Sequence, residues 1–119
     1  ATQQRFRVVA TTLSNDLPMM KCYQITEAEF MFKQLFDDME YTKQGISIKK
    51  GDTIFDIGAN IGMFALYCIL ATEGDVKLFS FEPIPNLATI CEENIKYYAK
   101  RDLTVSKVFA FGLTQPSLY

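Results

Sequence analysis

Residues 53–64 read TIFDIGANIGMF, an apolar run followed by a glycine-rich turn and a second apolar run. This order predicts a buried β-strand, a tight turn and the first turn of an α-helix. Gly58 allows the positive φ that the turn needs, Asn60 tolerates a left-handed conformation, and Gly62 allows the helix to begin close against the strand and a ligand. In an α/β sheet, such a turn marks the place where a nucleotide-like cofactor binds.

A carboxylate follows the next predicted strand. Residues 76–81 form that strand, and Glu82 and Pro83 come directly after it, with Glu82 twenty positions beyond Gly62. This spacing is typical of the acidic residue that binds the ribose hydroxyls of a cofactor. Two less favoured alternatives stay open: Glu82 is a solvated loop carboxylate, or the turn is a plain strand-to-helix connection in which Asp56 is a local cap.

The turn distinguishes between two cofactor classes. A dinucleotide fingerprint counted from Gly58 needs glycine at positions 60 and 63, where the chain has Asn60 and Met63. Asp56, at the end of the strand, would also repel a pyrophosphate. S-adenosylmethionine has no phosphate, its ammonium suits Asp56 directly or through water, and its ribose hydroxyls suit Glu82. The residues therefore predict a methyl donor rather than a nicotinamide dinucleotide.

Three strings in the chain resemble a known family. DIGANIGMF (56–64), FEPIPN (81–86) and GISIKKGDTIF (45–55) look like the FkbM-type S-adenosylmethionine-dependent methyltransferases, and the likeness covers roughly residues 29–113. The resemblance implies a Rossmann-like, doubly wound α/β sheet of the class I methyltransferase type. Members are mostly O-methyltransferases, either free-standing or inside polyketide and nonribosomal peptide synthases. By this resemblance, the residues that bind the cofactor are Asp56, Gly58, Asn60, Gly62 and Glu82.

Composition and charge narrow the classes of partner. The 119 residues allow one domain at most, with an ordinary 49% hydrophobic and 22% charged residues. A net charge of −2 and dispersed lysines disfavour a nucleic-acid partner. The longest apolar stretch, Met63 to Ala71, is too short to span a bilayer, and the N-terminus lacks a signal-peptide layout. We therefore expect no membrane partner and a cytoplasmic location.

Two residue types limit the chemistry of the chain. It has no histidine, which removes the commonest general base and every metal site built on imidazole, and we expect no metal ion. The three cysteines have no C-x-x-C spacing, and we expect them to be buried reduced thiols.

The predicted organisation has two parts: residues 1–50, a β-hairpin and an amphipathic helix, and residues 51–119, the first half of a Rossmann-like S-adenosylmethionine-binding domain. The hairpin strands are residues 6–12 and 19–24, around a turn at 14–18. A helix follows, with the form of a capping box at Thr26 and Glu29. Its apolar stripe is expected in the core rather than in a substrate groove, and consists of Ala28, Met31, Phe32, Leu35, Phe36 and Met39. Phe30 lies off the stripe and is the candidate for a partner or lid contact.

The second part has the order β-α-β-α-β, with helices at 63–71 and from an Asn86 cap to Tyr98, and a third strand at 105–111. The second helix shares one apolar face, made by Leu87, Ile90, Cys91, Ile95 and Tyr98. In the full methyltransferase sheet the Asp56 strand is central, yet one of its edges finds no partner within these residues. We expect the sheet to continue beyond Tyr119, or a second chain, by self-association or otherwise, to cover the apolar edge of Ile54, Phe55 and Ile57.

Methyl transfer needs an acceptor in line with the donor, and a hydroxyl acceptor also needs a base. Asp56 and Glu82 are predicted to hold the cofactor, so no catalytic residue is assigned. The predicted acceptor is a hydroxyl on a small molecule or a carrier-bound group. The alternative is a non-catalytic module that supports assembly in a larger enzyme and keeps the glycine turn only for folding.

Overall fold

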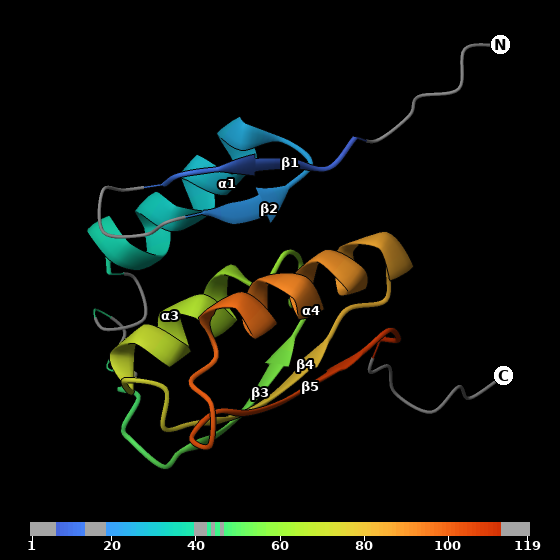
Figure 1. Cartoon of the computed structure of the whole chain (residues 1–119). Helices are drawn as coiled ribbons and strands as arrows, with labels where there is room; N and C mark the ends of the chain where they lie inside the picture. The colour runs from blue at the N-terminus through green and yellow to red at the C-terminus, as the bar shows by residue number, and fades with distance from the viewer. Residues whose placement is uncertain (1–6, 14–18, 40–42, 44, 46, 113–119) are drawn as a thin grey trace, which may run out of the picture.

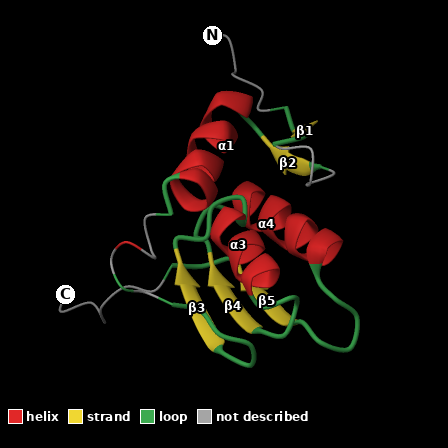
Figure 2. Ribbon diagram, turned by 90° about the vertical axis from the view of Figure 1, so that its left-hand side faces the viewer, coloured by secondary structure: helices red, strands yellow, loops and turns green. Residues whose placement is uncertain are grey.

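The computed structural model describes residues 7–13, 19–39, 43, 45 and 47–112. These residues form three layers (Figures 1 and 2). A parallel sheet forms the first layer, two helices lie on one of its faces, and the N-terminal hairpin and helix pack on the far side of those two helices.

The N-terminal strands are β1 (Val9–Thr11) and β2 (Met20–Cys22), which pair antiparallel with Ala10 opposite Lys21. The predicted pairing is therefore confirmed, although each strand is shorter than the sequence pattern indicated. The predicted turn at 14–18 lies outside the described residues.

Helix α1 (Ile25–Phe32) continues directly into a π-helical turn, η1 (Lys33–Asp37). The predicted cap was wrong: the N-cap is Gln24, two residues before Thr26, and Thr26 lies inside the first turn. The predicted position of Met39 in the apolar stripe was also wrong, because Met39 lies beyond the helix and is 46% exposed. In η1 the Asp38 N–H donates to the Lys33 carbonyl, five residues back, and this wider turn breaks the 3.6-residue repeat before it reaches Met39.

The sheet consists of β3 (Thr53–Ile57), β4 (Lys77–Phe81) and β5 (Val105–Phe109), all parallel and in the order β3-β4-β5. Helix α3 (Met63–Ala71) connects β3 to β4, and α4 (Pro85–Tyr98) connects β4 to β5. This β-α-β-α-β order confirms the predicted α/β class as a partial Rossmann-like fold. The third strand ends at Phe109 rather than at the predicted position 111.

Helix α4 begins at a different residue from the one predicted. Ile84 is the N-cap in an extended conformation, Pro85 is the first helical residue, and Asn86 lies within the first turn and caps nothing. Proline has a fixed φ that suits the first helical position and has no N–H to satisfy there, so it outweighs asparagine as the starting signal.

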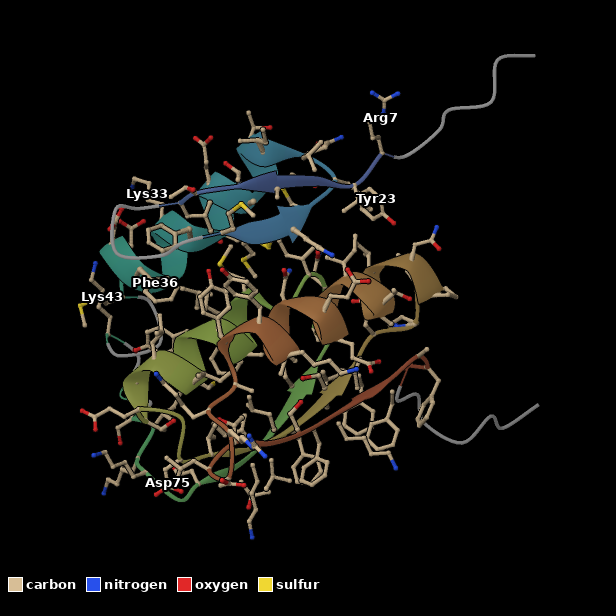
Figure 3. All side chains as sticks on the ribbon, viewed as in Figure 1. Arg7, Tyr23, Lys33, Phe36, Lys43 and Asp75 are labelled. Atoms are coloured by element: carbon tan, nitrogen blue, oxygen red, sulfur yellow. The ribbon has the colours of Figure 1, made fainter. Side chains whose placement is uncertain are left out.

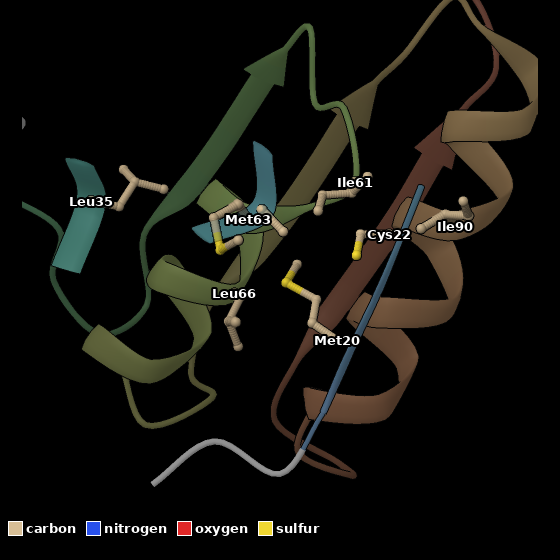
Figure 4. Packing of buried hydrophobic residues seen from close by; sticks show 8 residues of the cluster. Met20, Cys22, Leu35, Ile61, Met63, Leu66 and Ile90 are labelled. Atoms are coloured by element: carbon tan, nitrogen blue, oxygen red, sulfur yellow. The ribbon is translucent and has the colours of Figure 1, made fainter. Parts of the chain in front are cut away.

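Two apolar cores lie on opposite sides of α3 and α4, and α3 is accordingly apolar on nearly all faces. One core lies against the sheet and includes Cys68, Leu78 and Ile95. The other joins the hairpin and α1 to the two helices and consists of Met20, Cys22, Ala28, Leu35, Ile61, Met63, Leu66 and Ile90 (Figure 4). Phe36 of η1 adds to this core by stacking on Phe32 and meeting the edge of Tyr67 on α3 (Figure 3).

No described element covers the sheet face opposite α3 and α4 (Figure 2). Aromatic side chains lie on this face. Phe55 stacks on Phe79 with ring centroids 5.4 Å apart, and Phe81 stacks on Phe109 at 4.8 Å. Phe55 and Ile57 are 63% and 64% exposed, as predicted for an open edge at β3. Ile54 differs from the prediction, since alternate residues of a strand face opposite ways and Ile54 packs into the core under the helices.

Among the described helices, none has both the length and the apolar character needed to cross a membrane. The cytoplasmic location stays a prediction.

Candidate functional site

The turn between β3 and α3 has left-handed conformations at alternate residues. Gly58, Asn60 and Gly62 have φ values of 77°, 54° and 90°, which confirms the backbone conformations predicted for Gly58 and Asn60. The end of β4 holds the start of this turn, because the N–H groups of Gly58 and Ala59 both donate to the Phe81 carbonyl, at 2.9 and 3.0 Å. The turn is therefore anchored to the neighbouring strand as well as to its own helix.

The two glycines of the turn serve different purposes. A Cβ at Gly58 would meet nothing within 4 Å, so only its positive φ calls for glycine. A Cβ at Gly62 would lie 3.3 Å from the Cys91 sulfur and 3.4 Å from the Cys91 carbonyl oxygen. Within the protein, the close approach at Gly62 is thus made to α4 rather than to the strand.

This difference between the glycines is testable by alanine substitution. Gly62→Ala is expected to lower the free energy of unfolding by about 2 to 3 kcal/mol, because positive-φ strain adds to crowding against Cys91. Gly58→Ala is the matched control and is expected to lose only about 1 kcal/mol from strain. Urea denaturation measures both values, and equal losses in the two variants would show that crowding at Cys91 has no effect.

Glu82 follows β4 and is only 5% exposed, so the alternative of a solvated loop carboxylate is wrong. Its Oε1 accepts a hydrogen bond from the Asn60 N–H at 2.7 Å, and its Oε2 accepts one from the Ile84 N–H at 3.0 Å. The carboxylate therefore ties the middle of the glycine turn to the start of α4. Each oxygen retains a second acceptor position.

Asp56 lies on β3, one residue before the strand ends, and its side chain is 9% exposed. Its Oδ2 atom is buried and has no hydrogen-bond partner among the residues that the structure describes, and α3 has no side-chain cap, so Asp56 is not the cap of that helix. Burial raises the pKa of Asp56 to about 6, and the negative charge of Glu82 adds to this effect. An ionised, unpartnered carboxylate is costly in such a place unless a cation approaches it.

Two of the three cysteines, Cys68 and Cys91, lie near these carboxylates. All three are free and buried, as predicted. Burial raises the pKa of both Cys68 and Cys91 to about 12, and the charge of Asp56 contributes in each case. These two thiols therefore remain protonated near neutral pH. They are poor nucleophiles, because the thiolate is the nucleophilic form.

A cleft of about 340 Å³ opens beside Asp56, between the carboxyl end of β3 and the α1–η1 segment. Asp56, Gly58 and Asn60 line it on one side, and Met31, Gln34 and Leu35 line it on the other. Gly62 and Glu82 are not among the described residues that line the cleft; Glu82 holds the turn through the Asn60 N–H, and Gly62 lies against Cys91. Three of the five predicted site residues thus meet at one cavity.

Two smaller hollows follow α1 away from the cleft, and only the first of them adjoins it. The first, of about 270 Å³, shares Met31 and Asn60 with the cleft and also contacts Phe30, which is 62% exposed. The second, of about 260 Å³, shares Glu27 with the first and reaches Ile84. We call these three hollows together the α1 groove. The described residues that line these three hollows include the carboxylates of Asp56 and Glu27 and no lysine or arginine, so the α1 groove suits a cation better than a phosphate. A further hollow of about 620 Å³ shares Thr26 and Phe30 with the first small hollow, and there Lys33 is part of the lining.

The contribution of α1 to this groove was not predicted. The spacing of Met31 and Leu35 correctly placed both on one apolar face, and both contact the core. Spacing along a helix does not say which other element the edge of that face will meet. Here it meets the glycine turn, so two residues of the core stripe also line the cleft.

Comparison with known proteins places the chain beside methyltransferases. It is 44% identical over 59 residues to the 31-O-demethyl-FK506 methyltransferase FkbM of Streptomyces tacrolimicus, covering 50% of this chain and 22% of that protein. It is 33% identical over 69 residues to the methyltransferase sdnD of Sordaria araneosa, covering 58% of this chain and 26% of that protein. It is also 31% identical over 90 residues to the AMB antimetabolite synthetase AmbE of Pseudomonas aeruginosa, covering 76% of this chain and 4% of that protein.

No family model matches the chain. The chain spans about a quarter or less of the length of these relatives. Within that span, the resemblance to FkbM-type methyltransferases is confirmed.

Proposed function

We propose that this chain, which resembles FkbM-type methyltransferases, forms the S-adenosylmethionine-binding part of an O-methyltransferase. The observation that supports this most directly is the buried Asp56 carboxylate, which lines the cleft at the end of β3 and whose Oδ2 has no partner in the described part of the chain. A cation is the ligand that such a group favours. S-adenosylmethionine presents an ammonium and no phosphate, which agrees with a groove whose described lining has no basic side chain.

Each of the five predicted site residues has a role in this proposal. Asp56 binds the ammonium of the cofactor, and Gly58 and Asn60 shape the wall of the cleft through their left-handed conformations. Glu82 holds the turn through Asn60 and accepts the ribose hydroxyls with its remaining acceptor positions. Gly62 lets α3 begin against α4.

When bound, the cofactor supplies a methyl group on a positively charged sulfur. The residues of this chain bind and orient it, which is the main requirement of a transfer that proceeds by in-line displacement. We propose a hydroxyl on a small molecule or carrier-bound group as the acceptor. No described residue of the groove is assigned as the base that takes the hydroxyl proton.

The alternative of a non-catalytic assembly module is less favoured, because two of the relatives are named methyltransferases. Methyl transfer assayed on this chain and on a longer version that includes the rest of the sheet would separate the two hypotheses. Transfer by neither form would support the module.

Calorimetric titration with S-adenosylhomocysteine tests the proposal, because this product binds without an acceptor. We expect saturable, one-to-one binding at pH 8 and no binding of NADH, whose pyrophosphate would be repelled by Asp56. A chain that is folded by circular dichroism but binds no S-adenosylhomocysteine would contradict the proposal.

The affinity for S-adenosylhomocysteine is also expected to depend on pH. The pKa of Asp56 is about 6 without ligand, and the ammonium requires the ionised carboxylate. Affinity should therefore change little between pH 8 and 7 and fall as the pH drops through 6, becoming about tenfold weaker at pH 5 than at pH 8. Titrations at pH 8, 6 and 5 measure this, and equal affinity at all three would exclude Asp56 as the ammonium partner.

A further inference from the structure

We propose that Asn94 is a positioning residue that couples the N-terminal hairpin to the glycine turn and so keeps α1 in place as the outer wall of the α1 groove. This inference rests on the proposed function only in its last step, which states that the position of α1 affects the affinity for the cofactor. The coupling itself is a property of the ligand-free chain and is tested separately.

The hydrogen bonds of Asn94 join three segments that are distant in sequence. Asn94 lies on α4 and is 4% exposed. Its Oδ1 accepts from the Lys21 N–H at 2.8 Å, and its Nδ2 donates to the Lys21 carbonyl at 2.9 Å and to the Ile61 carbonyl at 2.8 Å. Both protons of the side-chain amide are used, and these partners determine which end is oxygen and which is nitrogen.

The amide of Asn94 acts toward β2 as a neighbouring strand would. It forms a pair of hydrogen bonds with both backbone groups of Lys21, at the edge of β2 that faces α4 rather than β1 (Figure 1). One turn further along α4, the Tyr98 hydroxyl donates to the Met19 carbonyl and accepts from the Met19 N–H. Asn94 and Tyr98 are four helical residues apart, a rise of about 6 Å, and two residues of an extended strand span about 6.8 Å. The spacing of the two side chains on α4 therefore matches the spacing of Lys21 and Met19.

The third bond of Asn94 extends this attachment to the site. Ile61 lies between Asn60, which Glu82 holds, and Gly62, which begins α3 against Cys91. The same side chain therefore contacts the hairpin and the turn that lines the cleft. A shift of β2 relative to α4 must either break the two bonds to Lys21 or move the side-chain amide that also binds the Ile61 carbonyl.

The position of β2 in turn determines the position of α1. Only Tyr23 and Gln24 separate Cys22 from the start of α1, and the first turn of α1 closes with the Ala28 N–H donating to the Gln24 carbonyl. From there, α1 and η1 supply Met31, Gln34 and Leu35 to the cleft. Together with the apolar core between these layers, Asn94 thus contributes to the distance between the two walls of the groove through one short connection.

An adjacent ion pair provides a matched control. Lys21 Nζ lies 2.8 Å from Glu93 Oε2, joining the same strand to the same helix, but both side chains are about half exposed. Exposed pairs contribute little to stability. Glu93→Ala should therefore leave the hairpin and the turn as they are, whereas Asn94→Ala removes three hydrogen bonds.

Amide hydrogen exchange of the ligand-free chain tests the coupling. In Asn94→Ala, the amides of Lys21, Ala28 and Asn60 are expected to exchange at least about tenfold faster relative to Leu78 in the sheet, and in Glu93→Ala less than about twofold faster. If the Lys21 amide exchanges faster in Asn94→Ala while the Asn60 amide exchanges as in the parent, Asn94 only anchors the hairpin and the proposal is wrong.

Exchange of the parent chain at increasing urea gives a second test that needs no variant. The amides of Lys21, Ala28 and Asn60 are expected to open as one cooperative unit with the same urea dependence. Separate slopes for the hairpin and the turn would overturn the coupling even if Asn94→Ala did not fold.

The step from coupling to cofactor affinity is measured by S-adenosylhomocysteine titration of the folded variants. Asn94→Ala is expected to bind on the order of tenfold more weakly than the parent, and Glu93→Ala equally well. Unchanged affinity of a folded Asn94→Ala chain would overturn the positioning role. If the parent itself does not bind, the proposed function fails, and the exchange experiments still decide whether Asn94 couples the two segments.

Discussion

Replacing Asp56 with asparagine is expected to stabilise the chain at pH 7 by on the order of 2 to 3 kcal/mol, while weakening S-adenosylhomocysteine binding on the order of 30-fold. The stability gain follows from the pKa of about 6, compared with an ordinary value of 3.8, for a carboxylate whose Oδ2 is buried without a partner. Asparagine keeps the shape but has no charge to desolvate. The loss of affinity follows because the same missing charge is the proposed partner of the ammonium.

The sign of this effect reverses the usual behaviour of a stabilising carboxylate. Because the pKa of Asp56 is higher in the folded chain than in the unfolded chain, the folded chain binds this proton more tightly. The contribution of Asp56 to stability is therefore greatest below about pH 4 and is lost as the pH rises through about 6. The advantage of Asp56→Asn should accordingly be present at pH 7 and absent near pH 4.

Urea denaturation of parent and variant at both pH values measures the effect. Asp102→Asn is the control, because Asp102 is an exposed residue at a φ of 68°, which asparagine tolerates equally well. It should change stability by less than about 0.5 kcal/mol at either pH. If Asp56→Asn is less stable than the parent at pH 7, the carboxylate has a stabilising partner and is not held ready for a ligand.

Replacing Glu82 with alanine is expected to lower the free energy of unfolding by about 2 to 4 kcal/mol, because the N–H groups of Asn60 and Ile84 both lose a charged acceptor. Glu82→Gln retains one acceptor oxygen and should lose roughly half as much. Glu92→Ala is the control: Glu92 is exposed on α4, its ion pair with Lys96 is weak, and the change should be within about 0.5 kcal/mol.

Binding by the Glu82 variants separates the structural role of this residue from its proposed role at the ribose. Glu82→Gln keeps the turn largely in place. After correction for the fraction of the variant that is folded, any remaining loss of S-adenosylhomocysteine affinity is attributable to the hydroxyl contacts. We expect about tenfold weaker binding at a temperature where the variant is fully folded. Affinity equal to that of the parent would limit Glu82 to supporting the turn.

These two substitutions are expected to change stability in opposite directions although both remove a carboxylate from the same corner of the sheet. Glu82 has backbone donors on both oxygens, whereas Asp56 has an oxygen without any. An unsatisfied charge next to a cleft is typical of a site that trades stability for ligand binding. The hydrogen-bond partners of each carboxylate, rather than the residue type, determine whether its removal raises or lowers the free energy of unfolding.

Local pattern predicted the elements of this chain well. The helix at residues 63–71 was predicted with the bounds that α3 has, and the strands around it differ by two residues at most at either end. The helix starts were predicted less well, because Thr26 and Asn86 both have the chemistry of a cap but lie inside the first turn. Capping depends on where the preceding chain enters the helix, and tertiary packing sets that direction.

Residue chemistry and spacing were enough to establish the strand–turn–helix at residues 53–71, the left-handed turn residues and the two carboxylates at the ends of adjacent strands. They were enough because each depends on neighbours within a few residues or on the shared edge of parallel strands. Packing alone determined that Gly62 meets Cys91, that α1 lines the cleft, and that Asn94 joins Lys21 to Ile61. These contacts join positions that are far apart in the chain, and their distances follow from how three layers fit around two cores rather than from any local repeat.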